Sequence, residues 1–221
     1  MAQATSASTR EAYGAALVEL GRENPDIVVL GGDLNVSTFT TPFAKEFPDR
    51  FFDFGAAEQI ILSVAAGLAS AGKVPFCSTF AVFGTGRAFD QMRVGVAQPS
   101  MNVKLVCTHA GLITGEDGVS AQAIEDVALM LSLPTVTVLT PSDGPETVAA
   151  VRAAAEIDGP VYVRLYRPAM PVLHADGYDF RLGEAETLRE GGDVTLVACG
   201  SMVAATLEAA ETLDAEGLSP R

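Results

Sequence analysis

The chain has 221 residues, of which 48% are hydrophobic and 19% are charged, and its formal net charge is −14 at pH 7. This size and composition allow a substantial core, so a globular protein is expected. The negative charge repels nucleic-acid phosphates and anionic lipids, which excludes both as main partners. No window holds about 18 uninterrupted apolar residues, and the start lacks the features of a signal peptide; no membrane segment is predicted, and a cytoplasmic location is expected.

Short apolar segments alternate with segments of helical pattern. The predicted strands are 27–30, 51–54, 74–77, 103–107, 135–139 and 161–165, and the predicted helices are 9–23, 57–71, 86–97, 122–132 and 143–157. Continuously apolar strands are typical of a parallel sheet that is covered on both faces. The alternation predicts an α/β fold with an open, mostly parallel sheet and helices on both faces, preceded by a flexible N-terminus over residues 1–8.

This alternation holds through residue 167 and then changes. Residues 168–192 are rich in proline, glycine and charge, which is typical of a linker. The apolar run 194–200 and the amphipathic segment 202–216 predict one more strand and one more helix. Because such a pair cannot bury its own faces, residues 193–221 are expected to be the incomplete start of a further domain.

Most of the unusual polar residues directly follow predicted strands. In open parallel sheets, ligands bind beyond the carboxyl ends of the strands, so these residues are candidates for a site. Glu58 is the strongest catalytic candidate, because it begins an apolar helix that should be buried. An ionised carboxylate there needs the helix dipole, a partner or a ligand. An ordinary glutamate in the first turn of a helix would give the same pattern.

Cysteine and histidine are scarce in this chain. Cys77, Cys107 and Cys199 lie far apart in apolar segments, which suits buried thiols rather than a disulfide framework. The two histidines are His109 and His174, and a zinc site built from these residues would need unrelated loops to converge. No metal site is therefore predicted within the chain.

Five motifs occur in the order in which they are found in the pyrimidine-binding domain of transketolases, which residues 9–167 resemble. The motifs are Gly31-Gly32-Asp33-Leu34, Gly55-x-x-Glu58-Gln59, Ser78-Thr79-Phe80-x-x-Phe83 followed by Arg87-Ala88-Phe89-Asp90-Gln91, Thr108-His109, and Gly115-Glu116-Asp117-Gly118. Each motif alone is weak, but the ordered set is specific. Residues 193–216 resemble the beginning of the third domain of the same family.

The resemblance implies an enzyme that uses thiamine diphosphate to move a two-carbon ketol unit from a ketose phosphate to an aldose phosphate. It gives Glu58 the hydrogen bond to N1′ of the cofactor's aminopyrimidine ring. Phe80 and Phe83 would form the aromatic wall against which this ring packs, and Asp33 would help to hold the bent cofactor. Gly86 stands where some members have a third aromatic residue, so the wall is expected to be thinner here.

The resemblance also implies a binding site for the sugar phosphate. Ser37, His109 and Arg167 would bind the phosphate, for which a guanidinium is a good donor. Asp117 would bind the hydroxyls of the sugar. Ala121 stands where many transketolases have a histidine, which leaves the identity of the sugar open.

The chain lacks the Gly-Asp-Gly motif with a later asparagine that holds the metal ion and the diphosphate in this family. The resemblance therefore implies the second subunit of a split transketolase. An N-terminal diphosphate-binding subunit would provide most of the ligands of Mg²⁺, and the assembly would be an α2β2 heterotetramer. Two alternatives stay open. One is a subunit of another thiamine diphosphate enzyme, either a deoxyxylulose phosphate synthase or a 2-oxo acid dehydrogenase β subunit, and the other is a non-catalytic truncated fragment that only associates.

Overall fold

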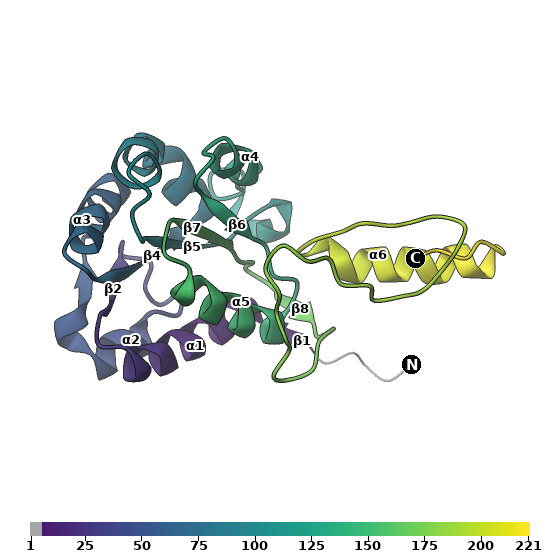
Figure 1. The fold of residues 1–221 in the computed structure, drawn as a ribbon. Coiled ribbons are helices and arrows are strands. Elements are labelled where there is room, and N and C mark those ends of the chain that lie inside the picture. Colours follow the sequence, from purple (N-terminus) through teal and green to yellow (C-terminus); the bar gives the residue numbers. More distant parts are fainter. Residues whose placement is uncertain (1–5) are drawn as a thin grey trace.

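The computed structural model describes residues 6–221, and its centre is a six-stranded sheet (Figure 1). The strands lie in the order β3-β2-β4-β5-β7-β6, and all of their pairings are parallel. They are β2 (Ile27–Gly31), β3 (Phe51–Asp53), β4 (Val74–Phe80), β5 (Lys104–Thr108), β6 (Thr137–Leu139) and β7 (Val161–Arg164). The six strands predicted between residues 27 and 165 are present, and the predicted parallel sheet is confirmed.

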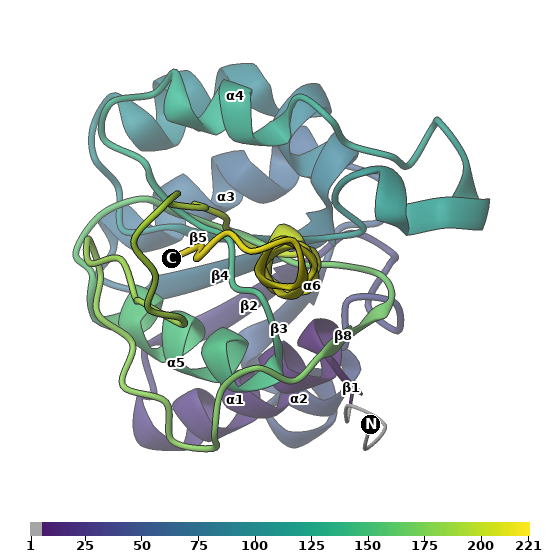
Figure 2. The ribbon, with the colours of Figure 1, turned by 90° about the vertical axis from the view of Figure 1, so that its right-hand side faces the viewer.

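Helices cover both faces of this sheet (Figure 2). The α-helices are α1 (Thr9–Glu23), α2 (Thr41–Glu46), α3 (Glu58–Ser70), α4 (Asp126–Leu131), α5 (Gly144–Glu156) and α6 (Met202–Ala215). The helices α1 and α5 share one apolar core with one face of the sheet, and α3 packs in a second core on the other face. No helix in residues 6–221 is both long and apolar enough to cross a membrane.

Side-chain caps explain where two of these helices begin. The Ser8 hydroxyl accepts a hydrogen bond from the Glu11 backbone N–H at the start of α1. Asp143 Oδ1 accepts one from the Glu146 backbone N–H at 2.9 Å and begins α5. Such caps satisfy backbone donors that a helix leaves free in its first turn. The short helix α2, which was not predicted, has a proline in its first turn.

Several short elements lie between the main ones. They are the 3₁₀ helices η1 (Pro48–Arg50) and η4 (Leu112–Asp117), and the π-helices η2 (Val82–Arg87) and η3 (Gln91–Ala97). The predicted α-helix over 86–97 is therefore corrected to two π-helical segments, of which the first begins earlier, at Val82, and the second ends at Ala97. The predicted helix over 122–132 begins only at Asp126, because Ala123 forms a bridge with Ala110.

Part of the segment that was expected to be flexible is ordered. Residues 1–5 lie outside the described residues. Ser6–Ser8 form the strand β1, which pairs antiparallel with β8 (Ala169–Pro171) at the start of the predicted linker. The two ends of the region 9–167 are thus fastened together.

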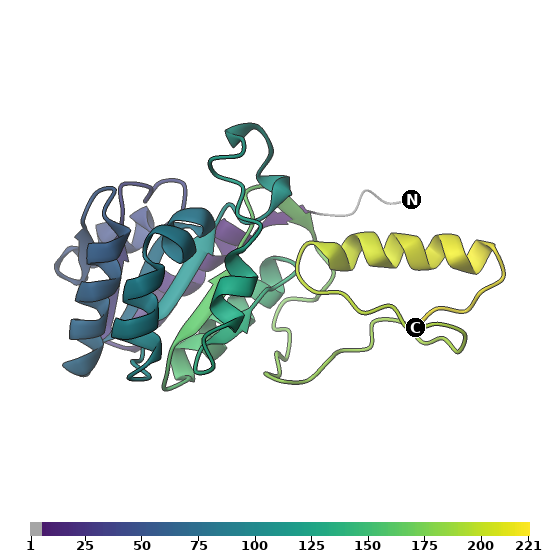
Figure 3. The ribbon, with the colours of Figure 1, turned by 90° about the horizontal axis from the view of Figure 1, so that it is seen from above.

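The C-terminal part differs from the prediction in one respect. The predicted helix is present as α6, and Figures 1 and 3 show it lying beyond the edge of the domain. The predicted strand over 194–200 is wrong: in the described chain this segment has only an isolated bridge from Val194 to Pro220. Val197 is 88% exposed, and Cys199 is exposed rather than buried. The apolar run has no neighbouring strand to pair with, so its pattern alone does not make it a strand.

Gly84 in η2 offers a test of how tightly this π-helical segment packs. A Cβ at Gly84 would lie 2.7 Å from Cys107 Sγ and 3.0 Å from Thr79 Cγ2. We expect Gly84→Ala to lower the free energy of unfolding by about 1–3 kcal/mol, measured by urea denaturation. Gly86 in the same segment is the matched control, since a Cβ there would meet no described atom within 4 Å. Equal effects of Gly84→Ala and Gly86→Ala would contradict this packing.

Candidate functional site

The structure places the predicted site residues at the edge of the sheet where its strands end. Asp33 and Ser37 follow β2, Glu58 follows β3 as the first residue of α3, and Phe80 is the last residue of β4. His109 follows β5, Asp117 ends the 3₁₀ helix after it, and Arg167 follows β7. These residues were expected beyond the carboxyl ends of the strands, and the structure confirms that location.

Glu58 is buried, with a side chain that is only 2% exposed. Its Oε2 accepts a hydrogen bond from Arg87 Nη1 at 2.8 Å, and its Oε1 accepts a longer one from Thr79 Oγ1 at 3.4 Å. The position in the first turn of α3 also places the carboxylate near the positive end of the helix dipole. A buried carboxylate with one charged partner and one weak partner keeps the capacity to accept a further hydrogen bond.

Two aromatic side chains next to this carboxylate form one stack. The rings of Phe80 and Phe83 are nearly parallel, at 12°, with their centroids 5.9 Å apart. The His109 ring stacks on Phe80 at 3.7 Å, and the Arg87 guanidinium lies 4.6 Å from the centre of the Phe83 ring. Arg87 therefore contacts both the carboxylate and the aromatic pair, and a flat apolar ring of a ligand suits this surface.

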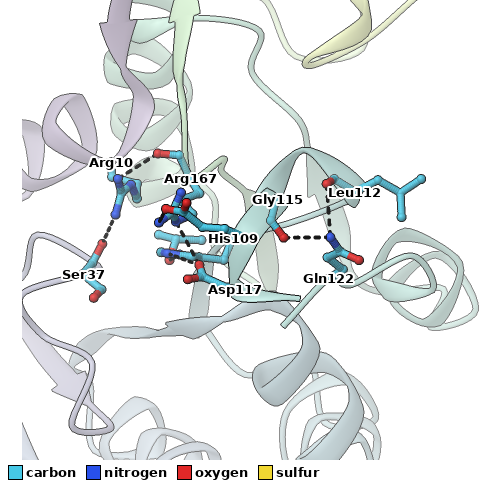
Figure 4. A network of polar contacts seen from close by, with 10 residues as sticks. Arg10, Ser37, His109, Leu112, Gly115, Asp117, Gln122 and Arg167 are labelled. Atoms are coloured by element: carbon cyan, nitrogen blue, oxygen red, sulfur yellow. Dashed lines mark hydrogen bonds and ion pairs between the residues drawn. The ribbon is translucent and has the colours of Figure 1, made fainter. Parts of the chain in front are cut away.

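Polar side chains from four segments form a second group, which we call the cationic cluster: Arg10, Ser37, His109, Asp117 and Arg167 (Figure 4). Arg10 Nη1 donates to the Ser37 carbonyl at 2.9 Å, and its Nη2 donates to the Arg167 carbonyl at 2.7 Å. Arg167 Nε lies 2.9 Å from Asp117 Oδ2. Two guanidinium groups at one place are notable in a chain of charge −14, and guanidinium groups suit a phosphate.

Sequence reasoning missed Arg10, although a signal was present. Helices that alternate with parallel strands begin at the carboxyl edge of the sheet, and Arg10 is the second residue of α1. The helix dipole disfavours a positive charge in the first turn. An arginine at this position therefore indicates a binding role. Its buried Nε has no hydrogen-bond partner among the described residues.

His109 is held in an unusual conformation for a residue other than glycine, with φ of +59°. Its side chain is 3% exposed; Nδ1 lies 2.8 Å from Thr108 Oγ1, and Nε2 lies 3.6 Å from Asp117 Oδ2. Burial of the imidazole, helped by the positive charge of Arg10, lowers the pKa of His109 to about 4. The ring is therefore neutral near pH 7 and serves as a hydrogen-bonding group rather than as a charge.

This lowered pKa predicts how stability depends on pH. Because the unfolded state binds a proton at His109 near the usual pKa of about 6.5 and the folded state does so only near pH 4, unfolding is favoured as the pH falls between these values. We expect the wild-type chain to lose about 1.4 kcal/mol per pH unit more than His109→Gln does over this window. Urea denaturation at several pH values from 7 to 4.5 measures the free energy of unfolding of both proteins. The same dependence on pH in both would contradict this prediction.

Asp33 lies in a turn that a neighbouring carboxylate holds. Asp53 accepts hydrogen bonds from the backbone N–H groups of Asp33 and Gly55 and from the Asn35 side chain. These bonds lower the pKa of Asp53, with Gly55 as the largest cause. Asp33 itself is exposed, and its backbone φ is +59°. Asp53 was not predicted, and it fixes the two loops that carry Asp33 and Glu58.

A family model described as the pyrimidine-binding domain of transketolase matches residues 5–172, and one described as the transketolase C-terminal domain matches residues 183–221. The chain belongs to the transketolase family. A protein of Methanocaldococcus jannaschii, named as a transketolase C-terminal section, is 44% identical over 95% of this chain and 67% of its own length. Human transketolase is 43% identical over 97% of this chain, which corresponds to 34% of the human protein.

Two solved transketolase structures are similar to this chain over almost its whole length. One is titled a split-gene transketolase in an inactive β4 tetramer: the TM-score is 0.88 at 54% identity, covering 97% of this chain and 69% of that one. Transketolase from Campylobacter jejuni has a TM-score of 0.89 at 26% identity, covering 99% and 35% respectively. The chain thus spans about a third of the length of full transketolases and about two thirds of split ones.

The residues of this transketolase-family chain fit one end of thiamine diphosphate better than the other. The buried Glu58 and the stacked pair of Phe80 and Phe83 suit an aromatic ring that has a hydrogen-bonding nitrogen. Among the described residues, three carboxylate and histidine side chains come close enough to hold a metal ion only at Asp143, Glu146 and His174. Asp143 and Glu146 follow β6 and Glu58 follows β3, and these two strands form opposite edges of the sheet.

Proposed function

We propose that the chain is the pyrimidine-binding subunit of a split transketolase, which transfers a two-carbon ketol unit from a ketose phosphate to an aldose phosphate. The observation that carries this proposal is the buried carboxylate of Glu58 beside the stacked pair of Phe80 and Phe83. Membership of the transketolase family supports the reaction class. The expected cytoplasmic location belongs to the same proposal.

Glu58 would act on a proton at N1′ of the aminopyrimidine ring. Bound thiamine diphosphate supplies the carbon nucleophile that cleaves the ketose and carries the ketol unit. Glu58 would hold the proton at N1′ and so favour the imino form of the ring. Because its side chain is buried, water would not compete for this hydrogen bond. Arg87, whose side chain is 47% exposed, has room to leave Oε2 when the ring enters. Phe80 and Phe83 would fix the orientation of the ring, and Asp33 would support the bent cofactor.

The cationic cluster would bind the phosphate of the sugar. Arg10 and Arg167 supply charge, and Ser37 and the neutral imidazole of His109 supply hydrogen bonds. In this structure Arg167 contacts Glu116 at 2.6 Å, and Glu116 is 79% exposed, so a phosphate can replace it at small cost. Asp117 would then accept hydrogen bonds from the hydroxyls of the sugar.

The diphosphate and Mg²⁺ would be held mainly by a separate diphosphate-binding subunit in an α2β2 assembly. The lack of the family's metal-binding motif in this chain supports this division. Exposed apolar side chains near the site suit a partner surface: Val36, Ile60, Leu112, Val119 and Ile124. One similar structure is titled a split-gene transketolase in an inactive β4 tetramer. An assembly of β subunits that is inactive agrees with a need for a second kind of subunit.

The test is ketol transfer in a reconstituted mixture. The chain is mixed with a diphosphate-binding transketolase subunit, thiamine diphosphate and Mg²⁺, and transfer from xylulose 5-phosphate to ribose 5-phosphate is measured. Turnover is expected only in the complete mixture, and omission of either subunit should reduce it to background. Association and cofactor binding without any transfer would contradict the transketolase reaction and favour another thiamine diphosphate enzyme. No association at all would favour the non-catalytic fragment.

A further inference from the structure

A second group of polar side chains lies where the predicted linker crosses the start of α5. Asp143 caps the start of α5, Glu146 lies in its first turn, and His174 follows β8. One potential ligand atom of each residue lies within 4.8 Å of the others. The sequence predicted no metal site because unrelated loops would have to converge, and here two of them do.

The His174 side chain is 6% exposed, and both of its nitrogens face carboxylates. Nε2 lies 3.2 Å from Glu186 Oε2, an oxygen that also accepts a hydrogen bond from Tyr178 at 2.7 Å. Nδ1 lies 3.1 Å from Asp143 Oδ2, but it is buried without an aligned hydrogen-bond partner among the described residues. Each nitrogen thus lies near one carboxylate, and the buried Nδ1 is on the side of Asp143.

Asp143 does not need His174 as a hydrogen-bond donor. Its Oδ2 already accepts hydrogen bonds from the backbone N–H groups of Leu173 and His174, at 2.7 and 2.8 Å. In the tautomer whose ring proton is on Nε2, the nitrogen that faces Glu186, Nδ1 presents a lone pair. A lone pair that faces a carboxylate oxygen at 3.1 Å is repelled unless a positive charge lies between them.

We propose that Asp143, Glu146 and His174 bind one divalent transition-metal ion, with Zn²⁺ as the preferred ion. An imidazole is a ligand that suits Zn²⁺ and other transition metals, and Zn²⁺ also binds carboxylates, whereas Mg²⁺ and Ca²⁺ prefer oxygen ligands alone. Glu186 would orient His174 through Nε2, as carboxylates do for metal-binding histidines. Water would complete the coordination.

Access and position support a structural role for this ion. Glu146, His174 and Glu186 line a cavity of about 530 Å³ between the linker and the C-terminal segment, which gives a hydrated ion a route to the site. The bound ion would fasten residues 173–174 to the start of α5. Asp143 follows β6 and Glu58 follows β3, and these are the two outermost strands of the sheet.

The experiment is a calorimetric titration of the purified chain with Zn²⁺, in the absence of partner, cofactor and Mg²⁺, together with its thermal unfolding. We expect one equivalent of Zn²⁺ to bind and to raise the Tm. His174→Gln and Glu146→Gln should each lose this binding and the rise in Tm. Glu186→Gln should weaken binding by about 10- to 100-fold, the usual effect of removing a partner of a metal ligand. His109→Gln is the matched control, because it removes the other histidine and should leave Zn²⁺ binding unchanged.

Asp143 is kept intact in these tests because it also caps α5. Circular dichroism of each variant without metal checks that it is folded. The proposal is overturned if no stoichiometric Zn²⁺ binding occurs, or if folded His174→Gln and Glu146→Gln bind as the wild type does. It is also overturned if Mg²⁺ at equal concentration binds as tightly. Double protonation of His174 at pH 7 by NMR, without Zn²⁺ binding, would show that a proton takes the place of the metal.

Discussion

Glu58→Gln is expected to lower kcat for ketol transfer by about 10²- to 10⁴-fold in the reconstituted enzyme, the usual contribution of general acid–base catalysis. The amide has nearly the same shape as the carboxylate, but it cannot gain and lose the proton that N1′ requires. Its oxygen can still accept the hydrogen bond from Arg87, so the fold should be preserved. The measurement is the steady-state rate at saturating sugar phosphates, with the Tm of each variant as a check on folding.

The control for this substitution is Glu19→Gln, which changes a carboxylate that is 51% exposed on α1. It should leave the rate unchanged. If Glu58→Gln kept more than about a tenth of the wild-type rate, Glu58 would be no more than an ordinary glutamate in a first turn. A loss of cofactor binding without a change in kcat would instead assign it to positioning of the ring.

Local pattern predicted those features of the chain that local chemistry determines. The strand β2 is apolar at every position because both faces of the sheet are covered, and all five of its residues are buried. Asp143 and Glu146 marked the start of α5 correctly. The expected parallel direction of the strands also placed Glu58, His109 and Arg167 at one edge, because the carboxyl ends of parallel strands lie together.

The local sequence pattern could not predict contacts between distant segments. Arg10 and Arg167 are 157 residues apart, and only the folded chain shows that Arg10 belongs to the cationic cluster. Arg87 reaches Glu58 from a π-helical segment, a rare geometry that an apolar periodicity of 3.6 residues does not indicate. The failed strand at 194–200 has the same cause, since strand formation needs a neighbour that the local pattern does not supply.

Asp126 lies at the centre of a buried network that stabilises the domain beside the candidate site. Its side chain is 1% exposed and accepts hydrogen bonds from Tyr162 and from Arg164 Nε, both at 2.7 Å. Arg164, only 15% exposed, also lies against Gly111, where a Cβ would come within 3.2 Å of its Nη2. Gly111 begins the loop that carries Asp117, so this ion pair supports the base of that loop.

Asp126→Ala is expected to lower the free energy of unfolding by about 3–5 kcal/mol, because it leaves the Arg164 guanidinium charged and buried without its partner. Asp90→Ala is the matched control: its ion pair with Arg93 is exposed at both ends and should contribute less than about 1 kcal/mol. Urea denaturation at pH 7 measures both. Asp126→Asn, whose single amide oxygen can accept from both Tyr162 and Arg164 Nε, should lose less than Asp126→Ala. If Asp126→Ala and Asp90→Ala had equal effects, burial of this pair would make no difference to stability, and the Asp117 loop would depend on other contacts, such as the Ala110–Ala123 bridge and the hydrogen bonds from Gln122 to Leu112 and Gly115.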